Sequence, residues 1–247
     1  MKLKEILLEN VNDNIWRKFL EDCAAFIEIN ESKLKNGYYL YRGTSSYDRN
    51  VIKKRFRQRD EVHGSSTKTW AYEHFKPNDY PSREDMIPTF GGEMSYNVGS
   101  EVHLVFPIDY NYKLQYTRGL DDFNDDDNPI GYKNSPFNIL MKVLDDEKFP
   151  DYLRDKARAF RREGGKYGYD EIRNFYGNVW DLAQKAASYD EDLREKLEAF
   201  KVEVGQYFQK SEVSKEMPGE KEIEVGLYAP QGFYYVKPDV LEHKSLF

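Results

Sequence analysis

Apolar residues recur at helical spacing in two parts of the chain. Near residues 12–34 an amphipathic helix is predicted, with Asn12 or Asp13 available as its N-cap. Its apolar face consists of Ile15, Phe19, Cys23 and Phe26. From Ser135 to about Lys210 the helical period returns, most clearly in the stripe Leu193, Leu197, Phe200, Val204 and Phe208. The pattern therefore predicts an N-terminal helix and a large helical block at about residues 135–210.

Short aromatic and β-branched runs outside these regions predict strands. They read YYLYRG, MIPTFG, VHLVFP, IEVGLYA and FYYV in chain order. The last two are joined by the turn PQG, which is typical of a β-hairpin. Residues 44–101 otherwise look loop-rich, with a short helix through TWAYEHF. The order of helix, strands, helices and strands favours an α+β fold with a mainly antiparallel core, in a single domain over residues 1–247.

Composition narrows the class of protein. A formal net charge of −7 argues against a chain whose whole surface binds nucleic acid. The single cysteine cannot form an intrachain disulfide, and the first residues contain no apolar run suited to a signal peptide or membrane span. The four histidines lack metal-ligand spacing. We therefore expect a cytoplasmic protein with no membrane partner and no metal.

One basic stretch stands out in this acidic chain. It consists of Lys53, Lys54, Arg55, Arg57 and Arg59, with Phe56 between them. A solvated loop explains it as well as phosphate contacts do. The phosphates could belong to a nucleotide or to a nucleic acid, and Phe56 offers a stacking face for either.

Three short segments carry candidate chemistry. Arg42 ends the first predicted strand, and Thr89 precedes a pair of glycines in the second. Strand alternation turns Glu222 and Glu224 to the same face, so two carboxylates lie close together. Taken singly, a surface ion pair explains the arginine, and a solvated edge strand explains the glutamates. Their order along the chain is more informative than any one of them.

In this order the segments resemble the ADP-ribosyltransferase family, in its Arg-Ser-Glu branch. That branch has an arginine on a first core strand, a Ser/Thr-bearing second strand and a Glu-x-Glu motif entering a later strand. The most specific match is EIEVGLYAPQGFYYV. The sequence is also similar to poorly characterised phage-borne proteins that combine a YRG start, a basic R-x-R-D stretch and a strand reading VFPI. The resemblance covers about residues 37–117 and 219–238.

Two positions depart from the family pattern. Pro88-Thr89 stands where the second strand usually carries Ser-x-Ser, and Glu220-Lys221-Glu222 offers a second Glu-x-Glu frame. Glu222 and Glu224 are preferred because Glu224 directly enters the apolar strand. Arg42 stands where the other branch of the family begins with histidine, which disfavours that branch.

The resemblance implies an enzyme that cleaves NAD⁺ and transfers ADP-ribose to a macromolecular acceptor, either protein or nucleic acid. Glu224 would stabilise the sugar cation, Glu222 would lie near the acceptor, Arg42 would hold the pyrophosphate and Thr89 would orient Glu224. Contacts to NAD⁺ would come from Arg42, Gly43, Thr44, Thr89 and Phe90. A phage-encoded protein of this kind would act in the host cytoplasm.

Three other functions fit parts of the same sequence. A non-catalytic nucleic-acid-binding protein would use the basic stretch, and an inhibitory phage protein would keep the fold without the chemistry. An NAD glycohydrolase would use water as acceptor. The enzymatic hypothesis makes a geometric prediction: Arg42, Thr89 and Glu224 should face one cleft in an ADP-ribosyltransferase-like β core.

Overall fold

The computed structural model describes residues 13–44, 50–56, 66–91, 101–117, 136–163, 169–219 and 223–247. Across these ranges the chain forms eight α-helices, two short 3-10 helices and eight strands in one sheet. The α+β class and the mainly antiparallel sheet predicted from the sequence are thereby confirmed.

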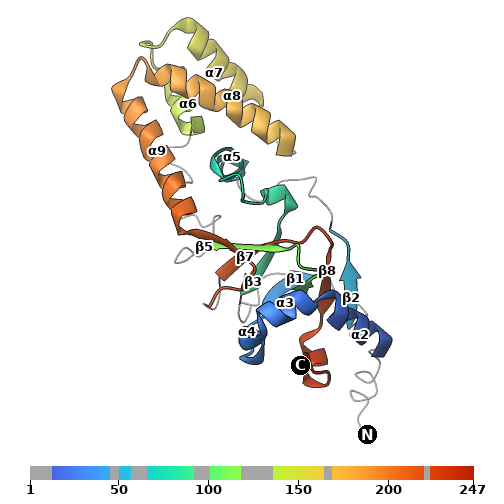
Figure 1. Cartoon of the computed structure of the whole chain (residues 1–247). Coiled ribbons are helices and arrows are strands. Elements are labelled where there is room, and N and C mark those ends of the chain that lie inside the picture. Colours follow the sequence, from blue (N-terminus) through green and yellow to red (C-terminus); the bar gives the residue numbers. More distant parts are fainter. Residues whose placement is uncertain are drawn as a thin grey trace. The chain divides into compact units, whose positions relative to one another are not determined.

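Contacts divide the chain into two compact units (Figure 1). The sheet unit comprises residues 1–58, 85–121 and 212–247, and the helical unit comprises residues 59–84 and 122–211. The helical block predicted at 135–210 thus falls within the helical unit. That both units belong to a single domain stays a prediction.

Eight strands make up the sheet, in the order β2-β8-β4-β1-β3-β7-β5-β6. Their bounds are β1 Leu40–Thr44, β2 Val51–Lys54, β3 Ile87–Gly91, β4 Glu101–Pro107, β5 Lys113–Thr117, β6 Ser211–Ser214, β7 Ile223–Tyr228 and β8 Phe233–Val236. All five predicted strand segments are present. The edge strands β2 and β6 were not predicted, because each is short and carries few apolar residues.

The predicted hairpin between the last two strands is wrong. β7 pairs with β3 and β5, whereas β8 pairs with β4 and β2. The chain does reverse as expected, because Gly232 has φ 99° and its amide donates to the carbonyl oxygen of Ala229 at 2.9 Å. A turn determines only the reversal of direction, and here each strand finds its partners in a different half of the sheet.

Three short helices cover part of the sheet unit, where one long helix was predicted (Figure 1). They are α2 Asp13–Asp22, α3 Ala24–Ile29 and α4 Glu31–Lys35. The helix is interrupted at Cys23 and Asn30, whose ψ values of 7° and 15° leave the helical range. Phe19, Cys23 and Phe26 of the predicted apolar face are buried, whereas Ile15 is exposed. The Phe19 and Phe26 rings pack edge-on against Phe106, with centroids 5.1 and 5.9 Å away. Near the C-terminus, the 3-10 helix η2 spans Pro238–Glu242.

The helical unit contains α5 Ser66–Phe75, α6 Pro136–Asp145, α7 Asp151–Glu163, α8 Tyr169–Ala187 and α9 Glu191–Lys210. The short 3-10 helix η1, Arg83–Asp85, lies at the boundary between the two units along the chain. The Trp70 ring from α5 lies 5.8 Å from Trp180 and 6.4 Å from Phe200, between centroids. The predicted helices and the buried stripe of α9 are confirmed, except that Phe208 is only half-buried. None of the helices that the structure describes is long and apolar enough to cross a membrane.

A single carboxylate, Asp22, joins α2 to the sheet. It accepts hydrogen bonds from Lys53 at 2.7 Å and from the Tyr234 hydroxyl at 2.8 Å, and it pairs with Lys18. Burial by itself would raise the pKa of Asp22, but the bonds from Lys18, Lys53 and Tyr234 outweigh it and lower the pKa to about 2. The charged form of Asp22 therefore stabilises the folded state.

We predict that this contribution disappears in acid. A lowered pKa stabilises the fold above the unfolded value near 3.8 and ceases to do so as pH falls towards 2. Denaturant unfolding at pH 5 and pH 2 should show that the wild type loses about 2 kcal/mol more than Asp22→Asn does. An equal loss in both proteins would contradict the prediction.

Candidate functional site

The three strands that carry the predicted site residues lie side by side in the sheet unit. β3 pairs with β1 on one side and with β7 on the other, although the three strands are far apart in sequence. Phe90 lies opposite both Tyr41 of β1 and Glu224 of β7. The segments that the sequence grouped by chemistry are therefore neighbours in space.

Alternation along β3 separates two kinds of surface. Thr89 and its cross-strand partner Val225 are both fully buried. The adjacent row of Tyr41, Phe90 and Glu224 is only half-buried. Side chains opposite each other in paired strands point to the same face, so the Thr89–Val225 face is core and the Phe90–Glu224 face is less buried. The second row continues through Tyr41, which packs against the core, to the buried Leu104 of β4.

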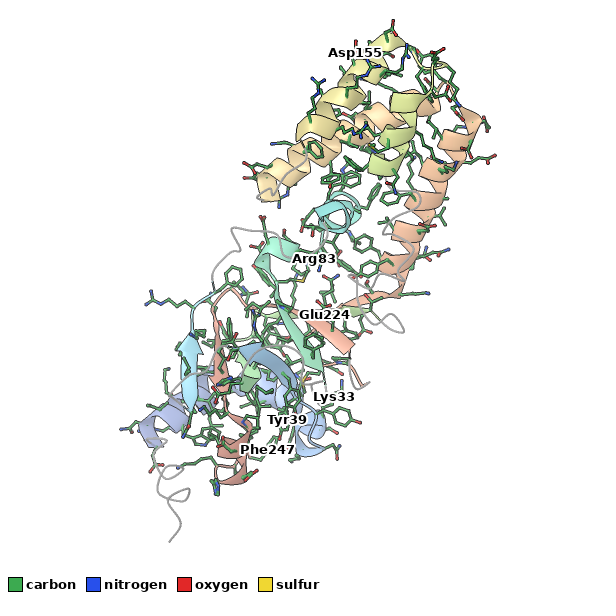
Figure 2. All side chains as sticks on the ribbon, turned by 180° about the vertical axis from the view of Figure 1, so that it is seen from behind. Lys33, Tyr39, Arg83, Asp155, Glu224 and Phe247 are labelled. Atoms are coloured by element: carbon green, nitrogen blue, oxygen red, sulfur yellow. The ribbon has the colours of Figure 1, made fainter. Side chains whose placement is uncertain are left out.

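Glu224 lies on the partly open face, beside two aromatic side chains. Phe90 is its direct neighbour on β3, and Tyr41 is the next one along the row. Figure 2 labels Glu224 on the ribbon of β7. Gly226, two residues further on the same face, lies under the thioether of Met86. Glu222, the other predicted carboxylate, lies outside the described residues.

Thr89 does not have the role predicted for it. Its hydroxyl donates to the carbonyl oxygen of Val225 at 2.8 Å, and its side chain is 0% exposed. A hydroxyl has one proton to donate, and here the core uses it. Thr89 and Glu224 lie in neighbouring cross-strand rows, and the side chains of these two rows point to opposite faces of the sheet. The prediction that Thr89 orients Glu224 is therefore wrong.

The Cα of Arg42, like that of Thr89, lies outside the cross-strand row that contains Glu224. Arg42 follows Tyr41 on β1 and pairs with His103 of β4, so its Cβ points to the face that Thr89 takes. The expectation that Arg42, Thr89 and Glu224 all face one cleft is therefore wrong. Sequence could not show this, because spacing within one strand says nothing about its register against another.

The guanidinium of Arg42 reaches the boundary between β1 and β3. The ladder between these strands consists of the pairs Leu40 with Gly91 and Tyr41 with Phe90. Beyond it, Arg42 Nη1 donates to the carbonyl oxygen of Pro88 at 3.3 Å. The side chain is half-buried. With five N–H donors, a guanidinium that makes this bond can still bind an anion.

Thr44, at the end of β1, contacts a cluster of polar side chains that the sequence did not indicate. Thr44 Oγ1 lies 3.0 Å from Nδ1 of His103, which is itself completely buried. Burial lowers the pKa of His103, which favours the neutral imidazole. Glu101 pairs with Lys237 at 2.8 Å nearby. Gly43, the remaining residue predicted to contact NAD⁺ on this strand, lies between Arg42 and Thr44 and pairs with Val102.

The basic stretch is partly structural. Lys53 belongs to the edge strand β2 and pairs with Asp22, and Phe56 packs towards Tyr228 with centroids 6.3 Å apart. Lys53 and Lys54 therefore lie in a strand and not in a solvated loop, which was one of the two alternatives for the stretch. The ring of Phe56 packs against the core of the sheet unit. Arg57 and Arg59 lie outside the described residues.

In the part of the chain that the structure describes, no group of three or more His, Cys, Asp or Glu side chains is arranged to hold a metal ion. Comparison of the chain with protein-family models, with curated proteins and with solved structures gives no match. Any function for the site is therefore argued from its residues and their geometry.

The position of Thr89 leads to a prediction. Thr89→Val keeps the shape of the side chain and removes one hydrogen bond to the Val225 carbonyl, so folding should weaken by about 0.5–1.5 kcal/mol in urea unfolding. If the protein turns over NAD⁺, as its sequence resemblance implies, turnover by the folded variant should stay within about twofold of the wild type, because the hydroxyl does not face Glu224. A large loss of turnover with unchanged stability would return Thr89 to the catalytic group.

Proposed function

We propose that this chain is an NAD⁺-dependent mono-ADP-ribosyltransferase with Glu224 at its reaction centre. The observation that carries the proposal is the half-buried row of Tyr41, Phe90 and Glu224 across β1, β3 and β7. Aromatic side chains next to a carboxylate suit a flat, positively charged ring such as nicotinamide.

The reaction needs little beyond a well-placed carboxylate. The bond between the nicotinamide nitrogen and C1′ of the ribose breaks, and its electron pair leaves with nicotinamide, which becomes neutral. Positive charge then develops on the ribose, where Glu224 would stabilise it. A nucleophile on the acceptor attacks C1′ and loses its proton, which completes the transfer of ADP-ribose.

Arg42 would hold the pyrophosphate from the boundary between β1 and β3. Its Cα lies two strand spacings from that of Glu224, which is about 10 Å. Because the Cβ of Arg42 points to the opposite face from Glu224, only its guanidinium, which lies beyond the Tyr41–Phe90 pair, would reach the pyrophosphate of an NAD⁺ whose nicotinamide ribose lies at Glu224. A planar guanidinium can bind two phosphate oxygens at once.

The strand arrangement supports the finer description of the fold as ADP-ribosyltransferase-like. The resemblance in sequence depends on an arginine strand, a second strand and a Glu-x-Glu strand, and these are β1, β3 and β7, which pair in that order. The alternative of a nucleic-acid-binding protein loses support, because Lys53 and Phe56 make contacts within the sheet unit. The acceptor is a protein or a nucleic acid.

Replacing Glu224 with Gln tests the proposal. The swap keeps the size but removes the charge and replaces one acceptor oxygen with an NH₂ donor, so transfer of labelled ADP-ribose from NAD⁺ in a lysate should fall by at least about 100-fold. Glu28→Gln, at an exposed position on α3 of the same unit, is the matched control and should retain activity. Full activity of Glu224→Gln would refute the assignment. Release of nicotinamide without labelled acceptor would identify a glycohydrolase instead.

The role of Arg42 is tested by Arg42→Lys. Lysine keeps the charge but cannot form two parallel bonds to a pyrophosphate, so NAD⁺ binding should weaken by about 1–3 kcal/mol in an equilibrium titration. Arg55→Lys changes an exposed arginine of the same unit and should leave the affinity unchanged. Equal loss in both variants would assign the basic stretch to the NAD⁺ site, and no loss in Arg42→Lys would remove Arg42 from it.

A further inference from the structure

Three exposed arginines lie close together near the C-terminal end of α7. Arg161 and Arg162 follow Arg158 by three and four residues, a spacing that places all three on one side of the helix. Each of these side chains is exposed, whereas Leu153 and Ala157 of the same helix are completely buried within the helical unit. We call Arg158, Arg161 and Arg162 the arginine face.

Two members of the arginine face differ from the other arginines of the neighbouring helices. Across α7, α8 and α9, four arginines are paired with carboxylates: Arg154 with Asp151, Arg158 with Asp155, Arg173 with Glu84 and Asp170, and Arg194 with Glu191. Figure 2 labels Asp155 on α7. No carboxylate that the structure describes pairs with Arg161 or Arg162. Their guanidinium groups are therefore available to a ligand.

The sequence accounts for this difference. On a helix, a carboxylate pairs with an arginine that lies three or four residues away. The residues at that spacing before Arg161 and Arg162 are Ala157, Arg158 and Ala159. Arg158 thus faces two further arginines, and like charges at this spacing destabilise a helix. The helix dipole favours cations in the last turn, but it does not distinguish arginine from lysine.

The phosphate groups of a nucleic acid match the arginine face. A planar guanidinium binds two phosphate oxygens at once, which a lysine ammonium does not do. One strand of a duplex presents a negative charge about every 3.4 Å along its axis. Arg158 and Arg162 are separated by about 6 Å along the helix axis, so neighbouring arginines reach nearby phosphates of one strand. Ala159, which is also exposed, adds little bulk between them.

We propose that the arginine face binds the sugar–phosphate backbone of a nucleic acid. Bonds to phosphate would replace the ion pair of Arg158 with Asp155, whose side chains are 52% and 68% exposed and whose attraction is weak in water. The site is separate from the basic stretch, where Lys53 makes its contacts within the sheet unit. It is also independent of the reaction proposed at Glu224. Backbone contacts carry no sequence information, so binding is sequence-independent and depends on salt.

A binding titration without NAD⁺ tests the arginine face. The probes are a short DNA duplex and a single-stranded RNA, both fluorescently labelled and of arbitrary sequence. The triple variant Arg158→Gln/Arg161→Gln/Arg162→Gln should bind at least about tenfold more weakly at physiological salt. The slope of log K against log salt should become shallower by about 2–3, because three cations no longer release counterions. The nucleic acid that the wild type binds more tightly is the one that the face takes.

The matched control removes the same total charge from other exposed positions of the helical unit. It is the triple variant Lys156→Gln/Lys185→Gln/Lys210→Gln, with one change each on α7, α8 and α9. Its affinity should stay within about twofold of the wild type. Equal weakening in both triple variants would show a general effect of net charge and overturn the proposal.

Two further results would also overturn it. One is that the wild type binds neither nucleic acid, and the other is that it binds polyglutamate as tightly as it binds them. If the arginine variant does not fold, as judged by circular dichroism, Arg161→Gln alone should change the salt slope by about one and Lys156→Gln should not. An unchanged slope in Arg161→Gln would then overturn the proposal. Failure of ADP-ribose transfer would refute only the proposed function, because the titration contains no NAD⁺.

Discussion

The pairing of β3 with β1 and β7 is the constraint on which the candidate site depends. β3 connects the half of the sheet that contains β2, β8, β4 and β1 to the half that contains β7, β5 and β6. Its contact with β1 is short, with Tyr41 opposite Phe90 and Leu40 opposite Gly91. This register brings Glu224 beside aromatic side chains and leaves the guanidinium of Arg42 at the end of the ladder. A shift of one residue would exchange the buried and half-buried faces of β3.

Two polar side chains, from helix α2 and from the junction of α3 and α4, bind strands and strand-flanking segments of the same unit. Asp22 binds Lys53 and Tyr234 and so joins α2 to β2 and β8. Asn30 binds the segment that precedes β7. Apolar contacts between helix and sheet are nearly non-directional, whereas buried hydrogen bonds require particular partners. Together the two side chains determine which strand segments the helices hold and in what position.

The structure also changes the chemical description of the site. The family pattern suggests a hydroxyl next to the glutamate, but in this chain the Thr89 hydroxyl belongs to the core and an aromatic residue, Phe90, is the direct neighbour of Glu224. The proposed reaction can proceed without the hydroxyl, since charge stabilisation comes from the carboxylate itself. Tyr41 and Phe90 would then contribute more to recognition of the leaving group than a serine or threonine could.

Sequence periodicity alone determined most of the local structure. The helical stripes of residues 135–210 and the aromatic strand segments are found where they were predicted, because amphipathic spacing reflects burial on one side of an element. The breaks of the first helix at Cys23 and Asn30 were missed, and the bond between Asn30 and Met217 is one that sequence spacing does not reveal. Residue type and order also suggested roles for Arg42 and Glu224, which stay predictions.

Tertiary structure decided which strands pair and which faces their side chains share. The turn before Gly232 indicated a hairpin, yet β7 and β8 belong to different halves of the sheet. Alternation relates Glu222 to Glu224 within one strand, but the relation of Glu224 to Thr89 and Arg42 depends on inter-strand register. That register results from packing and hydrogen bonding across the whole sheet, so the strands could be read from the sequence while the arrangement of the site could not.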